Sequence, residues 1–563
     1  MPERQWILPP APEPLAAGRL LRELEVPAFL AALLVGRGFS DIGAARQYLH
    51  PKMRELSAPE LLPEMPAAAD RVLAAIRSRE RIVLYGDYDV DGITSMAILA
   101  RVLKAFGAEV PCFLPHRAEE GYGLSSAGVE RCCEAHRPQL LLAVDCGTTS
   151  VKEVAGLRAR GVDVVILDHH EPAPGRPDCA ALVNPKCGAD FHSLCSAGIA
   201  FKLAHALQKR APVPGLDLKE YLDLVALATV ADIVPLTGEN RIFVRHGLRQ
   251  MAATRWPGLA ALMQVSGVSA PVRGSDVGFR LGPRINAAGR LGPAQESLRL
   301  LLTDDRAEAS RLAASLDGHN RERQAVERAV VLQAEGWVDN HFDPARDTTI
   351  VAGHRNWHIG VLGVVASRVM RRHHRPVFIV GFDEAGSGKG SGRSIEGLPL
   401  VELLRQCAAH LEKFGGHDMA AGVSVSEAAF PAFREAFEAA ARRMASPEIL
   451  TPRLHLDVEV ELHDLEVSLL EAQDLIEPFG AANPQPILFT RSVSPASAPR
   501  EMKEKHLKIE FAAGRRRLSA VFFNARLDAL PRPPWDVAYT LEWNTWQGRT
   551  EAQMRIVDLR RAA

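Results

Sequence analysis

The stretch RIVLYGDYDVDG, residues 81–92, decides the fold of this chain. Its first half is a short apolar run that ends in Gly86, which is typical of a strand buried in a parallel sheet. Its second half carries three aspartates at alternate positions, Asp87, Asp89 and Asp91. Apolar residues then recur at helical spacing over 96–106, so the pattern predicts a strand, an acidic loop and a helix in that order.

Further apolar runs follow at 110–114, 140–144 and 162–167, with helical stretches such as 148–160 between them. Strands that alternate with helices predict βαβ units and a largely parallel sheet, hence an α/β fold. Asp145 ends one run, and Asp168-His169-His170 ends another. Because ligands gather at the carboxyl ends of strands in open α/β sheets, we expect a site there.

The remaining sequence indicates several other domains. Residues 305–336 are helical and strongly charged, with a polar face that includes 321–324, which suits a spacer helix. Strand patterns near 349 and 376 indicate a second α/β unit, and short alternating strands after 452 suit a β-barrel such as an OB-fold. We therefore predict a helical extension (1–70), a parallel-sheet domain (71–304), a connecting helix (305–338), a second α/β domain (339–450) and a barrel (451–563).

Composition limits the classes of function. With 563 residues the chain needs roughly three or four hydrophobic cores. Its net charge of −1 gives no bulk electrostatic argument for a nucleic-acid partner. The eight cysteines form no CxxC pair, which disfavours zinc and a disulfide framework. The N-terminus lacks signal-peptide features and no apolar stretch is long enough to span a bilayer, so we expect a cytoplasmic protein without membrane contact.

The acidic loop at 87–91 has two interpretations. Three carboxylates so close together repel one another unless a cation compensates them, yet a solvated acidic loop explains the loop alone equally well. An EF-hand is excluded, because no glutamate follows at the required position and the loop follows a strand. A metal is favoured by three side chains at strand ends, Asp145, His169 and His170. Asp232 also favours a metal, because an aspartate within an apolar run needs hydrogen bonds or a metal as partner. Carboxylates with imidazoles and no thiols suit two Mn²⁺ or Mg²⁺ ions, which support phosphoryl transfer.

Several motifs in order carry a resemblance to a known family. They are GDYDVDG (86–92), DCG (145–147), DHH (168–170), ATVADIVPL (228–236), GPRINAAGRLG (282–292), SGRS (391–394) and GGH (415–417). Over about 80–560 the chain resembles the DHH phosphoesterase superfamily and, within it, the RecJ exonucleases. The resemblance implies a DHH domain, a connecting helix, a DHH-associated domain and an OB-fold. It also implies 5′→3′ hydrolysis of single-stranded DNA to 5′-mononucleotides by two metal ions, in DNA repair and recombination. The chain ends soon after the OB-fold, so we expect it to lack the further C-terminal domain of some relatives.

The resemblance also implies roles for the site residues. Asp145 would bridge both ions; Asp91, His169 and Asp232 would complete one site and Asp89 the other. Asp87 lies where related phosphoesterases use a more variable ligand. His170 would face the scissile phosphate or its water. His417 would approach the active site from the second domain, across a cleft that admits one strand.

Basic and glycine-rich segments are candidates for binding DNA. Arginines pair bidentately with phosphates, and glycines let the backbone approach closely, so we expect DNA contacts from Arg280, Arg284, Asn286 and Arg290. Pairing of these arginines with acidic neighbours is the alternative. Arg117 is a weaker candidate. Residues 386–394 form an anion-binding nest or a plain turn, and not a P-loop. In relatives this motif holds the terminal phosphate, which points to Ser391 and Arg393.

The segment 491–517 carries eight Lys or Arg against three Asp or Glu, which suits a barrel surface that binds single strands. A solvated basic face is the alternative, and Trp543 and Trp546 are each more typical of the barrel core. Two rival functions stay open, a DHH phosphodiesterase for short oligoribonucleotides or cyclic dinucleotides, and an inactive replication scaffold. By resemblance the partners are single-stranded DNA, a single-strand-binding protein and a helicase, and we expect a monomer.

Overall fold

The structure is a computed structural model that describes residues 4–10, 13–115, 123–502, 505–514, 516–546 and 549–562, without the side chains at 290, 291, 545, 546, 549 and 550. Contacts divide the chain into two compact units. The larger unit comprises Leu8–Asn286, Ala294–Ala314 and His455–Ala563, and the smaller comprises Met1–Ile7, Ala287–Pro293 and Ser315–Leu454.

The larger unit contains a five-stranded parallel sheet in the order β3-β2-β4-β5-β6. Its strands are β2 (Ile82–Gly86), β3 (Cys112–Phe113), β4 (Leu140–Val144), β5 (Asp163–Leu167) and β6 (Ala181–Val183). The predicted α/β class with a parallel sheet is confirmed, although β3 is shorter than the apolar run at 110–114. Gly86 pairs with Val144, and Val144 with Leu167, so the three strands end side by side.

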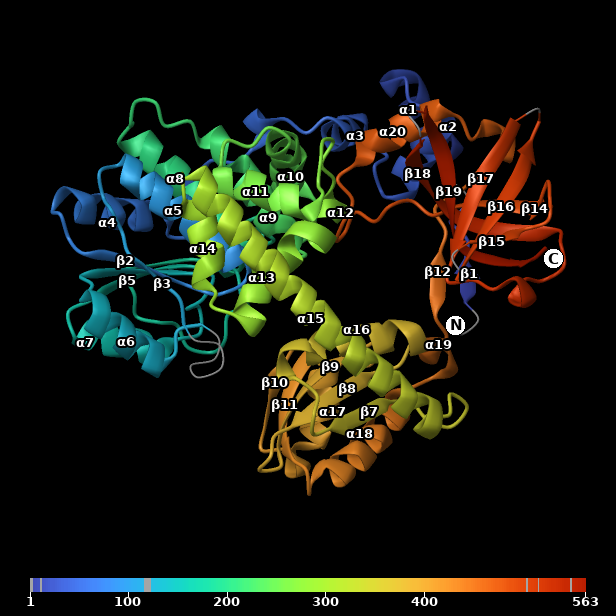
Figure 1. Ribbon diagram of the computed structural model, residues 1–563. Helices are drawn as coiled ribbons and strands as arrows, with labels where there is room; N and C mark the ends of the chain where they lie inside the picture. Colours follow the sequence, from blue (N-terminus) through green and yellow to red (C-terminus); the bar gives the residue numbers. More distant parts are fainter. Residues whose placement is uncertain are drawn as a thin grey trace. The chain divides into compact units, whose positions relative to one another are not determined.

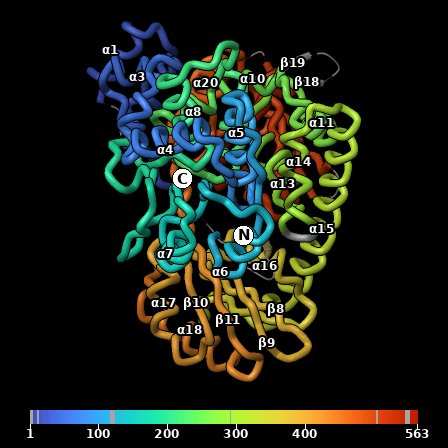
Figure 2. The backbone as a smooth tube through the Cα atoms, turned by 90° about the vertical axis from the view of Figure 1, so that its left-hand side faces the viewer, coloured from blue at the N-terminus to red at the C-terminus, as the bar shows by residue number. Residues whose placement is uncertain are grey.

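Helices cover both faces of this sheet (Figure 1). Val83 and Tyr85 of β2 pack in one core with side chains of α6 (Ser126–His136) and α7 (Val151–Ala159). On the opposite face, α5 (Val90–Ala105) and α8 (Ser196–Arg210) pack against each other and against the strands (Figure 2). Around them lie α4 (Met65–Arg77), α9 (Leu222–Ala231), α10 (Gly238–Met251), α11 (Pro257–Ser266) and α14 (Gln295–Leu302).

The arginine- and glycine-rich segment around 280–290 is helical. After the short α12 (Gly274–Asp276), a π-helical turn runs over Val277–Leu281 and leads directly into α13 (Gly282–Leu291). Gly282 allows this packing: a Cβ there would lie 3.2 Å from the carbonyl oxygen of Val277 and 3.4 Å from Cβ of Ala231. The glycines of this segment therefore serve helix packing as well as chain flexibility.

The C-terminal barrel has the topology of an OB-fold. Its strands are β13 (Val458–Glu459), β14 (Leu488–Val493), β15 (Arg500–Met502), β16 (His506–Ala513), β17 (Arg516–Phe523), β18 (Trp535–Trp546) and β19 (Arg549–Arg561). β16 and β17 are antiparallel, whereas β17 and β19 are parallel, as an OB barrel requires. A helix not predicted from the sequence, α20 (Val467–Ile476), lies between β13 and β14.

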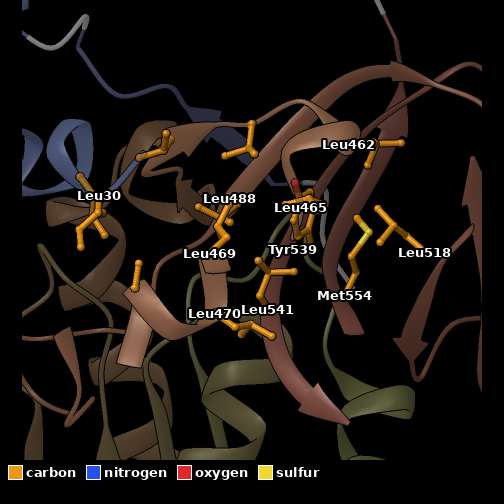
Figure 3. Close-up of a cluster of buried hydrophobic side chains, with 14 of the residues drawn as sticks. Leu30, Leu462, Leu465, Leu469, Leu470, Leu488, Leu518, Tyr539, Leu541 and Met554 are labelled. Atoms are coloured by element: carbon orange, nitrogen blue, oxygen red, sulfur yellow. The ribbon is translucent and has the colours of Figure 1, made fainter. Parts of the chain in front are cut away.

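The N-terminal extension is built into this barrel. Its helices are α1 (Pro14–Leu24), α2 (Ala28–Gly36) and α3 (Ile42–Leu49). Leu30 is fully buried in the same core as Leu488, Tyr539 and Leu541 of the barrel (Figure 3). Leu20 is fully buried in that core as well. The helices and the barrel therefore share one hydrophobic core, although 405 residues lie between Leu49 and His455 and the extension was predicted as a separate domain.

The smaller unit has a mixed sheet in the order β10-β11-β9-β8-β7, in which only β7 and β8 are parallel among the described strands. Its strands are β7 (Ile350–His354), β8 (Val377–Phe382), β9 (Ser387–Arg393), β10 (Lys413–Gly416) and β11 (Ala420–Ser426). Its helices are α16 (Leu362–His373), α17 (Leu400–Gln406), α18 (Phe430–Met444) and α19 (Pro447–Leu450), and β1 (Gln5–Ile7) pairs with β12 (Arg453–His455).

The glycine-rich segment 386–394 is a central strand of this sheet, so its prediction as a nest or turn was wrong. β9 pairs with β8 on one side and β11 on the other. A Cβ at Gly392 would lie 2.4 Å from the Phe378 ring, so the glycine makes room for a buried aromatic side chain.

The connecting helix α15 (Arg306–His341) spans the boundary between the units. Its predicted polar face is partly buried: Arg323 pairs with Glu327 at 2.6 Å, and Arg368 of α16 reaches the same carboxylate at 2.6 Å. Within the described parts of the chain, every helix is too short or too polar to cross a membrane.

Candidate metal centre

The acidic loop is held by the start of α5. Asp89 caps this helix, because its Oδ1 accepts the N–H of Gly92 at 3.1 Å. A Cβ at Gly92 would lie only 2.5 Å from the carbonyl oxygen of Asp87. A glycine is therefore required at this position for Asp87, Asp89 and Asp91 to share one tight turn.

Asp91 is buried against the start of a second helix. Its carboxylate accepts the N–H groups of Ser196 at 2.6 Å and Ala197 at 2.8 Å, in the first turn of α8. A helix N-terminus stabilises a negative charge. Burial nevertheless raises the pKa of Asp91 above its ordinary value, and His169 opposes that shift.

Asp145 follows β4 in the left-handed backbone region, at φ 62°. Aspartate tolerates this conformation better than most residues, and here it turns the side chain at the strand end. Its Oδ1 accepts the hydroxyl of Ser196 at 2.9 Å. Burial, together with the charges of Asp91 and Asp89, raises the pKa of Asp145 well above its ordinary value.

His169 lies among three carboxylates. Its Nε2 is 3.3 Å from Asp145 Oδ1, 3.5 Å from Asp232 Oδ2 and 3.7 Å from Asp91 Oδ2. Among the described residues none of these contacts has hydrogen-bond geometry, although the nitrogen is buried. Burial lowers the pKa of His169, which favours the neutral imidazole that can donate a lone pair to a metal.

Asp232 ends α9 and completes this set. Burial, followed by the charges of Asp91 and Asp89, raises its pKa to about 9. Raised carboxylate pKa values in one cluster mean that its negative charges repel one another without a compensating cation. The donor set therefore fits a divalent cation.

His170 belongs to a separate hydrogen-bond network. Its Nδ1 lies 2.7 Å from Asp168 Oδ1, and Thr148 donates its N–H to the other Asp168 oxygen at 2.9 Å. Asn184 donates to the Thr148 hydroxyl and to the His170 carbonyl, both at 2.9 Å. Burial lowers the pKa of His170, but the hydrogen bond and charge of Asp168 outweigh it and raise that pKa overall. This network fixes the orientation of the His170 ring.

The structure brings all seven predicted metal and catalytic residues of the larger unit together. Donor atoms lie within 4.8 Å of one another in each of three groups: Asp91, His169 and Asp232; Asp87, Asp89 and Asp145; and Asp145, His169 and His170. Hard oxygen donors with one or two imidazole nitrogens suit Mn²⁺ or Mg²⁺. The arrangement can therefore hold cations that share the Asp145 carboxylate.

The residues predicted to bind DNA lie in different places. Asn286 Oδ1 accepts the N–H of Val90 at 3.2 Å, so this side chain supports the acidic loop. Arg280 lies 3.2 Å from Asp276, and Arg284 donates to the Arg280 carbonyl at 2.6 Å. Acidic pairing, the alternative considered for these arginines, thus applies to Arg280. Arg117 and the Arg290 side chain lie outside the described residues.

The remaining predicted residues belong to the smaller unit. Arg393 Nη1 donates to Ser391 Oγ at 3.1 Å, on one face of β9. A Cβ at Gly363, in the first turn of α16, would lie 3.0 Å from Arg393 and 3.1 Å from Ser391. His417 is exposed between β10 and β11, and its approach to the metal cluster stays a prediction.

Three cations lie along one cross-strand row of the barrel, with the buried Val521 between two of them. Arg500 pairs across strands with Lys508, Lys508 with Val521, and Val521 with Arg555. Arg555 pairs with Glu542 at 3.2 Å and lies over the ring of Phe523, which is 41% exposed. Trp543 donates to Asp474 and packs beside the core, which agrees with its interpretation as a core residue.

Sequence reasoning missed the residues that orient the cluster. Ser196 holds two of the aspartates, and Thr148 and Asn184 hold the Asp168–His170 pair. The segment Cys195-Ser196-Ala197-Gly198 before an apolar helix was a usable signal of a helix start. Nothing local in the sequence indicated that this helix start would meet Asp91.

Comparisons with known proteins agree with this architecture. Three family models match this chain. The DHH family N-terminal domain matches residues 81–229, the DHHA1 domain matches 347–443, and the RecJ OB domain matches 456–558. The single-stranded-DNA-specific exonuclease RecJ of Bacillus subtilis is 35% identical over 96% of this chain and 69% of its own length. The Escherichia coli protein of the same name is 33% identical over 94% of this chain and 96% of its own.

Solved structures agree as well. RecJ of Thermus thermophilus in complex with Mn²⁺ has a TM-score of 0.86 and 34% identity, and the match covers 99% of this chain and 80% of that one. A second structure, of an exonuclease RecJ bound to manganese, has a TM-score of 0.62 and 41% identity, over 70% of this chain and 98% of that one. The fold, the motif order and these identities together show that the chain belongs to the RecJ family of DHH proteins.

Proposed function

We propose that this chain is a metal-dependent exonuclease that hydrolyses single-stranded DNA from the 5′ end to 5′-mononucleotides, in DNA repair and recombination. The observation that carries this proposal is the position of Asp145, which belongs to two of the three donor groups at the ends of parallel strands. The names of the relatives support the activity, and the bound Mn²⁺ and Mg²⁺ of the Thermus thermophilus structures support the metal.

Asp91, His169 and Asp232 would hold one ion, Asp87 and Asp89 the other, with Asp145 shared between them. Two such ions, when bound, activate a water and stabilise the charge that develops on the phosphate. The chain itself supplies orientation. The start of α8 fixes Asp91 and Asp145, and Asp168 fixes the His170 ring beside the cluster, where His170 would contact the scissile phosphate or its water.

Each unit carries side chains that are candidates for DNA contacts. Ser391 and Arg393 would bind the 5′ phosphate, since a hydroxyl, a guanidinium and a helix start together suit an anion. Arg280 and Arg284 are the described candidates beside α9, and Arg500, Lys508 and Arg555 would bind the backbone on the barrel. Roles for Arg117, Arg290 and His417 stay predictions, as do a monomeric state and the single-strand-binding protein and helicase partners.

The test uses strands labelled at the 5′ or the 3′ end and a matching duplex, with Mn²⁺ or Mg²⁺. We expect the wild type to release labelled mononucleotide rapidly from the 5′-labelled single strand only. Asp145→Asn should reduce the rate by at least about a thousandfold, because it removes the carboxylate that both ions would share. Asp190→Asn, at an exposed acid outside the cluster, is the matched control and should act like the wild type.

Other outcomes separate the rival functions. Hydrolysis of dinucleotides or cyclic dinucleotides with long strands left intact would favour a small-substrate phosphodiesterase. A wild type that takes up no Mn²⁺ and cuts nothing would favour the scaffold role.

A further inference from the structure

A short loop, residues 233–236, leads from Asp232 at the end of α9 towards α10. Ile233 in this loop has φ 60°, in the left-handed region, where a β-branched residue is a genuine outlier. A strained backbone of this kind persists only where the surrounding structure holds it. The contacts that hold the loop therefore also fix Asp232, which belongs to one donor group with Asp91 and His169.

Asn240 is a residue that holds this loop. It lies in the first turn of α10 and is fully buried. Its Nδ2 donates to the Pro235 carbonyl at 3.0 Å and to the Ser193 carbonyl at 2.6 Å. Ser193 lies three positions before Ser196, which holds two of the candidate metal ligands. One amide thus ties the segment after Asp232 to the segment that leads into α8.

The chain keeps this link at a cost in stability. Among the described residues, no group donates a hydrogen bond to the buried Oδ1 of Asn240, and a buried oxygen without a partner destabilises the fold. Gly238 has φ 47°, and a Cβ there would lie 2.8 Å from the Phe191 ring. This glycine lets the segment before α8 approach α10, so that the Ser193 carbonyl reaches the amide. The link is thus kept despite an unsatisfied oxygen, which points to a role other than stability of the fold.

The barrel also holds the loop 233–236. The N–H of Leu236 donates to the Ala481 carbonyl at 2.8 Å. A Cβ at Gly480 would lie 2.7 Å from Leu236 Cδ1, so the barrel backbone lies directly against this side chain. In the first turn of α10, the buried Arg241 donates to the carbonyl of Ile476, the last residue of α20, at 3.0 Å. The loop is therefore held by both α10 and the barrel, which belong to the same unit.

We propose that Asn240 is a positioning residue for Asp232: its amide, together with the Ala481 carbonyl of the barrel, sets where this carboxylate lies in the metal centre. The inference deepens the proposed function and rests on the metal centre of that function. Asn240 acts through the ligand, as the partners that orient metal ligands do, and such partners change metal affinity by about 10–100-fold. The affinity for the metal therefore depends on contacts outside the donor groups.

The test measures Mn²⁺ binding to the full chain by calorimetric titration, without DNA. The variants are Asn240→Ala, Asp232→Asn and the two together. Gln473→Ala is the matched control, because Gln473 is also a buried amide and donates to the Leu541 carbonyl at 3.2 Å inside the barrel. Urea unfolding gives the stability of each variant. If Asn240→Ala does not fold, Asn240→Ser, which keeps one donor, takes its place.

Asn240→Ala should lower the affinity for one of the two Mn²⁺ ions, the one held by the Asp232 group, by about 10–100-fold. In the Asp232→Asn background it should cause little further loss, since a residue that acts through a ligand has no effect once that carboxylate is gone. Gln473→Ala should lower stability yet bind Mn²⁺ like the wild type. Excess Mn²⁺ should restore hydrolysis by Asn240→Ala to near the wild-type kcat, with KM for the strand unchanged.

Wild-type Mn²⁺ affinity in folded Asn240→Ala would overturn the positioning role. So would an equal loss with and without the Asp232 carboxylate, because independent effects add. An equal loss in Gln473→Ala would also overturn it, since lowered stability would then be the cause. If the wild type shows the expected Mn²⁺ affinities but cuts no strand, the proposed function fails and the positioning role stands. Hydrolysis by the wild type, with no effect of Asn240→Ala on Mn²⁺ affinity, would do the reverse.

Discussion

The hydroxyl of Ser196 donates a hydrogen bond to Asp145 Oδ1 at 2.9 Å, and this bond joins the start of α8 to the end of β4. The N–H of the same residue reaches Asp91 at 2.6 Å. One residue, with no ionisable group of its own, therefore positions two of the candidate metal ligands that lie 54 positions apart in the sequence.

Replacement of Ser196 by Ala should weaken metal binding without unfolding the protein. The main-chain bond to Asp91 survives, but Asp145 loses its orientation, and supporting partners of ligands contribute about 10–100-fold to metal affinity. Mn²⁺ titration measures this directly. Ser126→Ala, which removes a surface hydroxyl bonded to Glu153, is the control. Equal Mn²⁺ affinity in the two variants would contradict the positioning role.

Gly92→Ala should disrupt the acidic loop. The new Cβ would lie 2.5 Å from the carbonyl oxygen of Asp87, so the loop must move. Asp87, Asp89 and Asp91 would move with it. We expect loss of Mn²⁺ uptake and of hydrolysis, measured together with the circular dichroism spectrum. Gly156→Ala is the matched control, since a Cβ on that exposed face of α7 meets nothing within 4 Å and should stabilise the protein by about 0.5–1 kcal/mol. Full metal uptake by Gly92→Ala would refute this account.

Asp223→Asn should make the protein more stable at neutral pH. Burial raises the pKa of Asp223 from 3.8 to about 6, against the hydrogen bonds from Thr254 and Trp256. Between these values the unfolded chain loses its proton while the folded chain keeps it, so stability falls as pH rises, by about 3 kcal/mol in total.

The neutral amide lacks this pH dependence and can donate to the Thr254 hydroxyl. The gain of Asp223→Asn over the wild type should therefore be small at pH 4 and largest at pH 7, in urea unfolding. Asp178→Asn, at an exposed acid, should show no such trend. A gain that is the same at both pH values would rule out Asp223 as its source.

Arg500→Ala with Lys508→Ala should weaken single-strand binding and its dependence on salt. The two cations lie directly opposite each other on neighbouring strands, a destabilising arrangement unless an anion compensates it. The slope of log affinity against log salt should fall by roughly 0.7 for each phosphate that the variant no longer binds. Arg526→Ala, at an exposed arginine that pairs with Asp528 outside the basic segment 491–517, is the control. If the salt dependence of binding is unchanged in the double variant, the DNA strand does not contact these two side chains.

The sequence predicted the sheet and its acidic edge because the signals are local. Each strand of 140–144 and 163–167 is apolar along its whole length, and parallel strands in register must end together, so Asp145 and Asp168 had to be neighbours. The order of motifs also identified the family. None of these inferences needed contacts between distant elements.

Other features could not be predicted from local patterns. The glycines of β9 predict a nest or a turn until the Phe378 ring is seen against Gly392. Those of 282–292 predict a close approach of the backbone to DNA until Ala231 is seen against Gly282. The N-terminal helices show an apolar pattern that does not say which core they join. Leu30 joins the barrel because that core, about 400 positions away in sequence, has an apolar face to cover.

The sequence by itself thus determined the fold class, the family and the candidate donor side chains, since strand periodicity and ligand chemistry are properties of short segments. Only the tertiary structure decided that the start of α8 meets Asp91 and that Asn286 supports the acidic loop. These relationships depend on how helices far apart in the chain pack, and packing is settled by the shape of the whole core.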